Sequence, residues 1–451
     1  MVRLLIYVAI SLFLSFQVGA QRYAFKYLHS TDQFIVNNDG DKVYCFFKVK
    51  ESKTQAVYRK VFLSEDLVPM DSVEYQIDGN PVLIASGESE HYTYHAFETK
   101  VEKIQMIQFL ISDKAGNIVH QFKKTAVDFT AVFGKEVKPK SVNIHFIPDK
   151  SKDMLLLEVV DVDGRYNPRL VAWNISDGTV LWQSDIPSLG FIRTTETQVI
   201  GLTRIDGGVK TSYTIYVFDK ATGKHVSVPF IKSGGQRSID VVATNGKTLM
   251  IAGAESESND KNSRLYMSMF DLEGNILFDR MDTTDRMGKY RRHLMGSAFD
   301  KDGNLVLIAE GYKIDATRAV ATTAAAVALG VLVGGISIGG GVPADNKIDF
   351  ITSAVMSSST GQVQWYRNFP VGPWHDFATF YTDGERVLIG VKSKFLLYNV
   401  SDPAVAPSQF ATVKMSEQLI LTSFGPAVVY RNSSKSRIVV EMIERDVVGN
   451  R

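Results

Sequence analysis

The stretch Leu170-Val-Ala-Trp173-Asn-Ile-Ser-Asp177-Gly178-Thr-Val-Leu-Trp182 shows a pattern that recurs along the chain. An apolar run typical of a strand leads into a polar turn that ends at a glycine, and an aromatic residue follows four positions later. Glycine readily adopts the positive φ that such a turn requires, and the aromatic ring can pack between neighbouring sheets. The stretch therefore predicts a β-hairpin whose second strand carries a packing aromatic side chain.

Further copies of this pattern lie at 215–224, 267–278 and 355–365, and two of these three also place an aromatic residue four positions after the glycine. A second turn type, Asn-Gly or Asp-Gly, alternates with them at 245–246, 302–303 and 383–384, and each is followed by an apolar run. Together the two turn types describe a four-stranded unit of about 45–50 residues, which is the length of a propeller blade.

The segment around Trp173 and Trp182 resembles the repeat of the quinoprotein-type (pyrroloquinoline-quinone-like) β-propeller, with its strand, its Asp-Gly turn and its Leu-Trp ending. The resemblance covers roughly two-thirds of the chain and implies a fold rather than a function. The known quinoprotein dehydrogenases carry a vicinal cysteine pair and a set of calcium-binding carboxylates around the cofactor. This chain has only Cys45, so the resemblance implies no cofactor.

The fold class expected from these patterns is all-β. Residues 141–451 are expected to form a β-propeller of about six blades, with seven as the alternative, beginning near residues 141, 188, 237, 291, 373 and 416. The last of these blades is short by a strand, so a strand from the other end of the chain is expected to complete it, and 125–133 is the candidate.

The preceding residues 21–134 contain strand-like runs without the repeat. They are expected to form a separate β-sandwich-like domain, and the alternative is one or two degenerate blades. The boundary is expected at 134–140, where Pro139 and three lysines lie.

Residues 1–20 have the composition of a cleaved signal peptide, with Arg3, an apolar run and the small residues Val18-Gly19-Ala20 before Gln21. No cysteine follows the cleavage site, so a lipoprotein is not expected. A single cysteine in the chain also excludes intramolecular disulfides, and export without disulfides favours the bacterial periplasm or exterior. Lys+Arg 50 against Asp+Glu 49 argues against a nucleic-acid partner.

Residues 319–344 carry no charge, and the interval from Gly274 to Gly361 exceeds the neighbouring intervals between turn glycines, so the segment is interpreted as an insertion in one blade. Ala326, Gly330 and Gly334 form a small-xxx-small ridge that suits contact with a membrane or with another copy of the chain. Three interpretations remain open: packing on the propeller, membrane contact, and a loop without fixed structure.

Ligands of propellers usually bind at one end of the central channel, near the starts of the innermost strands. The residues expected there are Arg237, Asp240, His293, Trp374, His375, Asp376 and Glu417, and a looser alignment adds His145, Arg193 and Arg292. Such a set suits a polar ligand, a sugar or a peptide. The alternative is that each residue only makes hydrogen bonds within its own blade.

No catalytic residues, metal ligands or cofactor-binding motifs are assigned, and the oligomeric state is left open. His91 and His95 would lie on one face of a strand about 13 Å apart, too far to share a metal, and are interpreted as surface residues. The sequence favours a non-enzymatic binding or scaffold protein of the cell envelope that holds a protein or glycan. One alternative is a hydrolase of glycans or peptides using Asp240, Asp376 and Glu417; another is a protein that contacts membranes through 319–344.

Overall fold

The computed structural model describes the chain from Arg22 to Ile443 except for residues 30–31, 40–41, 102–103, 134–141, 148, 150–151, 162, 165, 188, 208–209, 231–235, 238, 240, 245–246, 257–263, 272, 282–289, 301, 314–346, 376–378, 383–384, 392–393, 403, 412–417 and 423. The chain divides into two compact units. The first lies within 1–82, 392–397 and 408–451, and the second within 83–391 and 398–407.

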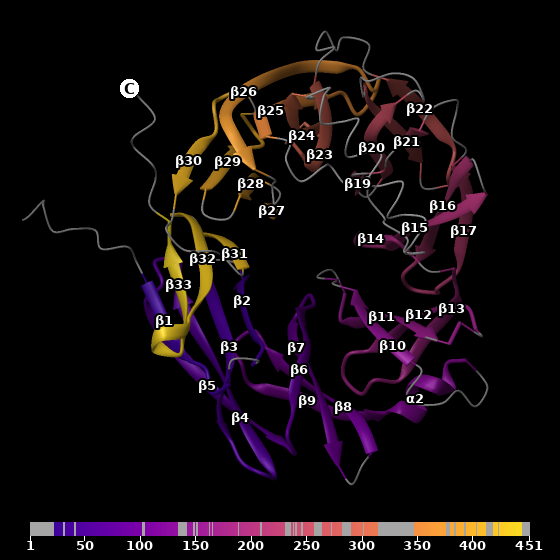
Figure 1. The fold of residues 1–451 in the computed structure, drawn as a ribbon. Helices are drawn as coiled ribbons and strands as arrows, with labels where there is room; N and C mark the ends of the chain where they lie inside the picture. Colours follow the sequence, from indigo (N-terminus) through magenta and orange to yellow (C-terminus); the bar gives the residue numbers. More distant parts are fainter. Residues whose placement is uncertain are drawn as a thin grey trace, which may run out of the picture. The chain divides into compact units, whose positions relative to one another are not determined.

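The first unit contains two complete antiparallel sheets, which we call blades 1 and 8, together with the outer strands of a third sheet described below (Figure 1). Blade 1 has the order β2 (Phe34–Asp39), β3 (Lys42–Glu51), β4 (Gln55–Ser64) and β5 (Pro69–Asp78). Blade 8 has the order β1 (Arg22–Lys26), β33 (Arg437–Met442), β32 (Gly425–Asn432) and β31 (Gln418–Thr422). The first strand of the chain therefore pairs with the last.

The prediction that a strand from the other end of the chain completes the last blade is confirmed, but the strand is β1 and not residues 125–133. Residues Ala126–Ala131 form the helix α2, and Thr125 ends β9, which pairs with β8. The strand that completes blade 8 is β1, with Tyr23 opposite Val440. Phe25 of β1 stacks on Phe47 with ring centroids 3.9 Å apart, and this contact buries the strand against blade 1.

The second unit repeats the same up-and-down sheet. Blade 2 has the order β6 (Val82–Glu88), β7 (Tyr92–Val101), β8 (Ile104–Asp113), β9 (Ile118–Thr125). Blade 3 has the order β10 (Val142–Ile147), β11 (Met154–Asp161), β12 (Arg169–Asn174), β13 (Val180–Asp185). Blade 4 has the order β14 (Phe191–Thr194), β15 (Gln198–Gly207), β16 (Lys210–Asp219), β17 (His225–Phe230).

Blade 5 has a divided first strand, because β18 (Gln236–Arg237) and β19 (Val241–Thr244) both pair with β20 (Thr248–Ser256), which β21 (Arg264–Asp271) and β22 (Ile276–Met281) follow. Blade 6 has the order β23 (Tyr290–Phe299), β24 (Leu305–Lys313), β25 (Lys347–Met356), β26 (Val363–His375). Blade 7 has the order β27 (Thr379–Thr382), β28 (Arg386–Val391), β29 (Lys394–Asn399), β30 (Ser408–Ala411), and its last two strands lie wholly or mostly in the first unit. First strands of consecutive blades touch one another, since β14 contacts β19, β19 contacts β23 and β23 contacts β27.

The chain is an all-β β-propeller, as predicted, but it has eight blades, so the counts of six and seven are both wrong. The N-terminal β-sandwich is not shown, because the described residues of 22–125 form β1 and the two meander sheets of blades 1 and 2. The repeat is hard to recognise in the sequence of blade 1 because its turn lacks the glycine. In blade 1 the positive-φ turn position between the third and fourth strands is held by Leu67 (φ 62) instead of glycine.

The predicted positive-φ glycines are confirmed at Gly178, Gly223, Gly274 and Gly361. Each also lies against the outer strand of the preceding blade. A Cβ added to Gly223 would come within 2.5 Å of the Trp182 ring, whose Nε1 donates a hydrogen bond of 2.6 Å to Lys220 O. The equivalent close approaches are Phe122 to Gly178, Val228 to Gly274 and Phe278 to Gly361. The outer-strand aromatic therefore packs between blades as predicted, with a valine replacing it at one junction.

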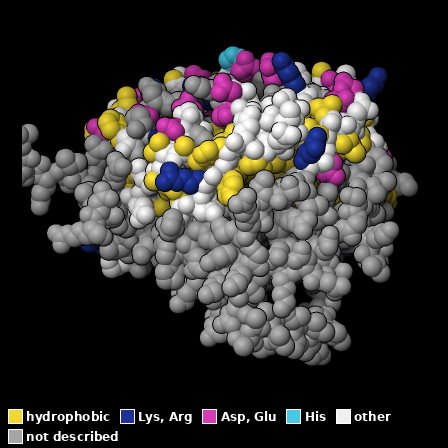
Figure 2. All heavy atoms as spheres, turned by 90° about the horizontal axis from the view of Figure 1, so that it is seen from above, with side chains coloured by type: hydrophobic (Ala, Val, Ile, Leu, Met, Phe, Trp, Pro, Cys, Tyr) yellow, Lys and Arg dark blue, Asp and Glu magenta, His cyan; other side chains and the backbone are white. Residues whose placement is uncertain are grey.

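The outer strands also carry exposed aliphatic side chains beside these turns. Two examples are Leu181 on β13 and Ile276 on β22, which are 51% and 58% exposed. Figure 2 shows hydrophobic side chains at the surface next to acidic and basic ones on one face of the molecule.

We expect Gly223→Ala to destabilise the protein more than Gly164→Ala. Both glycines have φ +67, but nothing lies within 4 Å of a Cβ added to Gly164. Gly164→Ala should lower the free energy of unfolding by about 1–2 kcal/mol through backbone strain. Gly223→Ala should lower it by about 1–3 kcal/mol more, because the methyl group meets Trp182. Urea unfolding of both variants measures the difference, and equal losses would show that the contact between the blades carries no stability.

Candidate functional site

Seven residues were predicted to contact a ligand, and three of them, Asp240, Asp376 and Glu417, lie outside the described residues. Arg237 lies on β18 and His293 on β23, both first strands, as expected. Trp374 and His375 lie at the end of β26, an outermost strand, where they pair with Ile348 and Lys347. These two residues therefore do not begin the first strand of blade 7, which starts at Thr379. The predicted signal peptide 1–20, the segment 319–344 and its residues Ala326, Gly330 and Gly334 also lie outside the described part of the chain.

His145, from the looser alignment, forms a polar pair on β10, the first strand of blade 3. It lies on β10 directly opposite Glu158 of β11 in the backbone register, and its Nδ1 is 3.1 Å from Glu158 Oε2. The other carboxylate oxygen, Oε1, accepts the N–H of Leu189 at 3.2 Å. The Glu158 side chain is 4% exposed, whereas the His145 side chain is 60% exposed.

The contact with Glu158 bears on which ring nitrogen of His145 carries a proton. An ionised carboxylate only accepts hydrogen bonds, so opposite an ionised Glu158 the Nδ1 of His145 is the donor. In the neutral ring Nε2 is then an acceptor, and the exposed side chain can present it to a hydroxyl group or another donor. A buried carboxylate that orients an exposed imidazole is a preorganised polar contact rather than a loose surface histidine.

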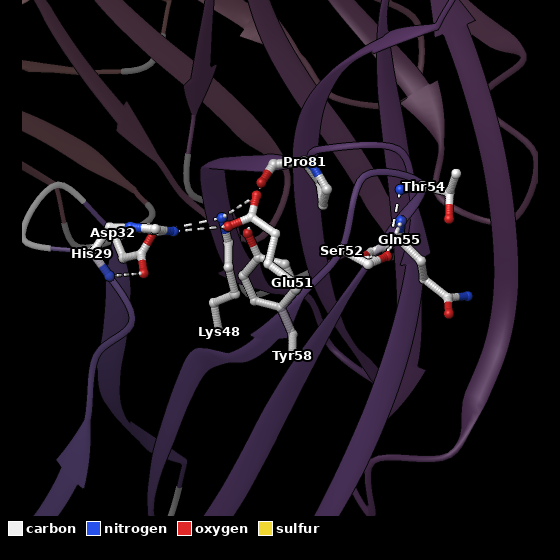
Figure 3. A network of polar contacts seen from close by, with 9 residues as sticks. All are labelled: His29, Asp32, Lys48, Glu51, Ser52, Thr54, Gln55, Tyr58 and Pro81. Atoms are coloured by element: carbon white, nitrogen blue, oxygen red, sulfur yellow. Dashed lines mark hydrogen bonds and ion pairs between the residues drawn. The ribbon is translucent and has the colours of Figure 1, made fainter.

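The first unit contains a second polar cluster, which the sequence analysis missed (Figure 3). The Lys48 side chain is 7% exposed, and its Nζ lies 3.5 Å from both Asp32 Oδ1 and Glu51 Oε1. His29 Nε2 is 3.1 Å from Glu51 Oε2, and the His29 N–H donates to Asp32 Oδ2 at 2.8 Å. The two carboxylates flank the buried ammonium, and the cluster holds the start of β2 to the hairpin between β3 and β4.

Arg431 of β32 adds a link from blade 8 to this cluster. Its Nη2 donates to Asp32 O at 2.9 Å, and its guanidinium lies 5.0 Å from the centre of the Phe34 ring and 5.6 Å from that of Tyr27. These contacts fasten the connection between β1 and β2 to the C-terminal strands. The Lys48 cluster is therefore interpreted as part of the junction between blades 8 and 1.

His91 and His95 differ from each other, so the interpretation of both as surface residues is wrong for His95. His95 is fully buried, with Nδ1 2.8 Å from Ser86 Oγ. His91 is exposed, and its Nδ1 lies 2.7 Å from Asp153 Oδ2 in the hairpin between β10 and β11. Ser89 Oγ and the His91 N–H both donate to Asp153 Oδ1, at 2.8 and 3.0 Å. This arrangement joins blades 2 and 3.

A fully enclosed ion pair joins the next two blades. Lys220 Nζ, which follows β16, lies 2.7 Å from both carboxylate oxygens of Asp149, and the two side chains are 1% and 2% exposed. Burial lowers the pKa of Lys220, although Asp149 acts in the opposite direction. Because neither group reaches solvent, the pair holds blades 3 and 4 together rather than contacting a ligand.

Among the described residues, no group of three or more His, Cys, Asp or Glu side chains could hold a metal ion. The helices in the described part of the chain include none long and apolar enough to span a bilayer.

Cys45 is fully buried, and burial raises the pKa of its thiol. As the single cysteine, it cannot form the vicinal disulfide of the quinoprotein dehydrogenases, so the residues do not fit that cofactor site.

No protein-family model and no curated protein sequence matches the chain. Solved propellers do match it. The β-propeller domain of the trilobed protease from Pyrococcus furiosus is 12% identical, with a TM-score of 0.39 and coverage of 86% of this chain and 92% of that one. Quinohemoprotein alcohol dehydrogenase from Comamonas testosteroni is 11% identical, with a TM-score of 0.42 and coverage of 91% and 72%. The Pan2 WD40 domain from Neurospora crassa is 9% identical, with a TM-score of 0.37 and coverage of 81% and 90%.

These likenesses confirm the fold-level resemblance to quinoprotein-type propellers. At such identities they show the fold alone, because unrelated activities share the propeller.

We expect the pKa of His91 to lie above 6.5, because its hydrogen bond and its charge interaction with Asp153 favour the protonated ring. A raised pKa in the folded state means that the pair stabilises the protein below pH 6.5 and that this contribution is lost as the pH rises through the folded-state pKa. An NMR titration of the imidazole measures the pKa. Asp153→Asn should return it toward 6.5, and an unchanged value in that variant would contradict the assignment.

Proposed function

We propose that the protein is exported and acts as a non-enzymatic binding or scaffold protein of the bacterial cell envelope, holding a protein or glycan at its propeller loops. The observation that supports this function is the His145–Glu158 pair. It presents a fixed, exposed imidazole on a first strand, the part of a propeller where ligands usually bind.

Binding at His145 can be tested with purified protein on an array of bacterial envelope glycans and envelope proteins. His145→Ala should weaken the bound signal by about tenfold, the loss expected for one good hydrogen bond in a desolvated site. His91→Ala is the matched control, because His91 is also paired with a carboxylate and its side chain is 65% exposed.

Two results would contradict the proposal. One is a wild-type protein that binds nothing on the array, or that binds equally well without His145. The other is chemical conversion of the bound ligand, detected by chromatography and mass spectrometry, which would make the protein an enzyme.

Export is tested separately. Expression of the full chain in a bacterium should yield an envelope fraction whose mature protein begins at Gln21, as measured by intact-mass spectrometry and N-terminal sequencing. A cytoplasmic product that retains residues 1–20 would contradict this part of the proposal.

A further inference from the structure

The first strand of blade 3 exposes part of one face. Along β10 the side chains alternate, and Asn143 and His145 are both exposed. Ile144 and Phe146 lie on the opposite face and pack against the core between blades 2 and 3. Ile147, the next residue on the exposed face, is buried in the core that blades 3 and 4 share. Residues two apart on a strand point to the same side with their Cα atoms about 7 Å apart. Asn143 and His145 are therefore neighbouring polar groups at the open end of this face.

The carboxylate behind His145 gives this face a negative character. The Glu158 side chain is 4% exposed, and among the described residues its carboxylate contacts the His145 imidazole and the Leu189 N–H. Neither partner carries a positive charge while the imidazole is neutral. An ionised carboxylate that water reaches poorly is screened less than an exposed one, so its field extends to the His145 ring. A positively charged ligand group is favoured there, and a carboxylate or a phosphate is disfavoured.

The imidazole presents an acceptor to such a group. With Nδ1 donating to Glu158, Nε2 of the neutral His145 ring is an acceptor, and the carboxylate on the other nitrogen raises its basicity. The His145 side chain is 60% exposed, so a ligand can reach it. An ammonium group brings three N–H donors together with the complementary charge, and a hydrogen bond from a charged donor is stronger than one from a neutral donor.

Asn143 supplies the neutral part of the site. Its amide both donates and accepts hydrogen bonds, and a hydroxyl group is a ligand group that does the same. The spacing of about 7 Å between Asn143 and His145 is one that two substituents of a single sugar ring can bridge when each forms a hydrogen bond. A lysine side chain would instead place its apolar stem beside this polar amide. A compact ligand with an ammonium group near hydroxyl groups is an amino sugar.

We propose that Asn143 and His145 on β10 bind an amino sugar, with Nε2 of His145 accepting a hydrogen bond from the ammonium group and Asn143 binding a hydroxyl group. This proposal rests on the proposed binding function and names the ligand class of that site.

The test is calorimetric titration of the mature protein at neutral pH with chitotriose, the trisaccharide of glucosamine. Triacetylchitotriose, in which every amine is acylated and uncharged, and trilysine, an amine-bearing peptide, are the comparison ligands. Wild-type protein should bind chitotriose more tightly than either. Raising the salt from about 50 to about 500 mM NaCl should weaken the binding, because it depends on a charge interaction.

Three variants separate the contributions. His145→Ala should weaken chitotriose binding by about tenfold or more, because it removes the acceptor of the ammonium group. Glu158→Gln keeps the size of the side chain and removes its charge, so it should weaken binding and remove most of the salt dependence. Asn143→Ala should weaken binding by about threefold and leave the salt dependence unchanged, because it removes a neutral hydrogen bond.

His91→Ala is the matched control, because His91 is also an exposed histidine paired with a carboxylate, and this variant should bind like wild type. Circular dichroism and thermal unfolding check that each variant is folded. If Glu158→Gln does not fold, His145→Ala and Asn143→Ala carry the test, since both replace exposed side chains.

The proposal is overturned if wild-type protein does not bind chitotriose, if triacetylchitotriose binds equally well, if trilysine is preferred, or if the His145 and Asn143 variants bind normally. Any of these results together with a His145-dependent ligand on the array would leave the proposed function standing. An array without a ligand would remove that function itself.

Discussion

The blades of the second unit depend on one contact, in which a side chain on the outer strand of a blade lies against the turn glycine of the next blade. It recurs at four junctions, of which Trp182 with Gly223 is the best satisfied because the indole N–H also donates to Lys220 O. Glycine meets two requirements there at once, a positive φ and room for the neighbouring ring. Because this contact fixes the spacing of the blades, it also positions the first strands and the polar residues on them.

The first unit joins its blades by different means. In blade 1 the corresponding turn uses Leu67 instead of glycine, and blades 8 and 1 are joined by aromatic stacking of Phe25 on Phe47 and by the polar cluster around Lys48. Pairing of β1 with β33 brings the first and the last of the described strands into one sheet. Blade 8 is thus held by contacts of its own, including those of Arg431 with the connection between β1 and β2.

The candidate site could be predicted only in part. The spacing of the turns placed Arg237 and His293 on first strands correctly, because a hairpin turn determines where the strands on either side of it lie in the sequence. It misplaced Trp374, because β26 continues to His375 and no turn signal marks its end. It could not show that Arg193 lies opposite Ile200 of the neighbouring strand.

The sequence by itself determined the all-β class, the four-stranded repeat and the turn glycines, because φ preferences and alternating hydrophobicity are properties of neighbouring residues. Only the tertiary structure decided the number of blades, the pairing of β1 with β33 and the partners of His145 and Lys48. These features depend on residues that are far apart in the chain, or on which side of a strand meets its neighbour. Strand pairing and ion pairing leave no short-range signal, since each is set by what the folded chain brings together.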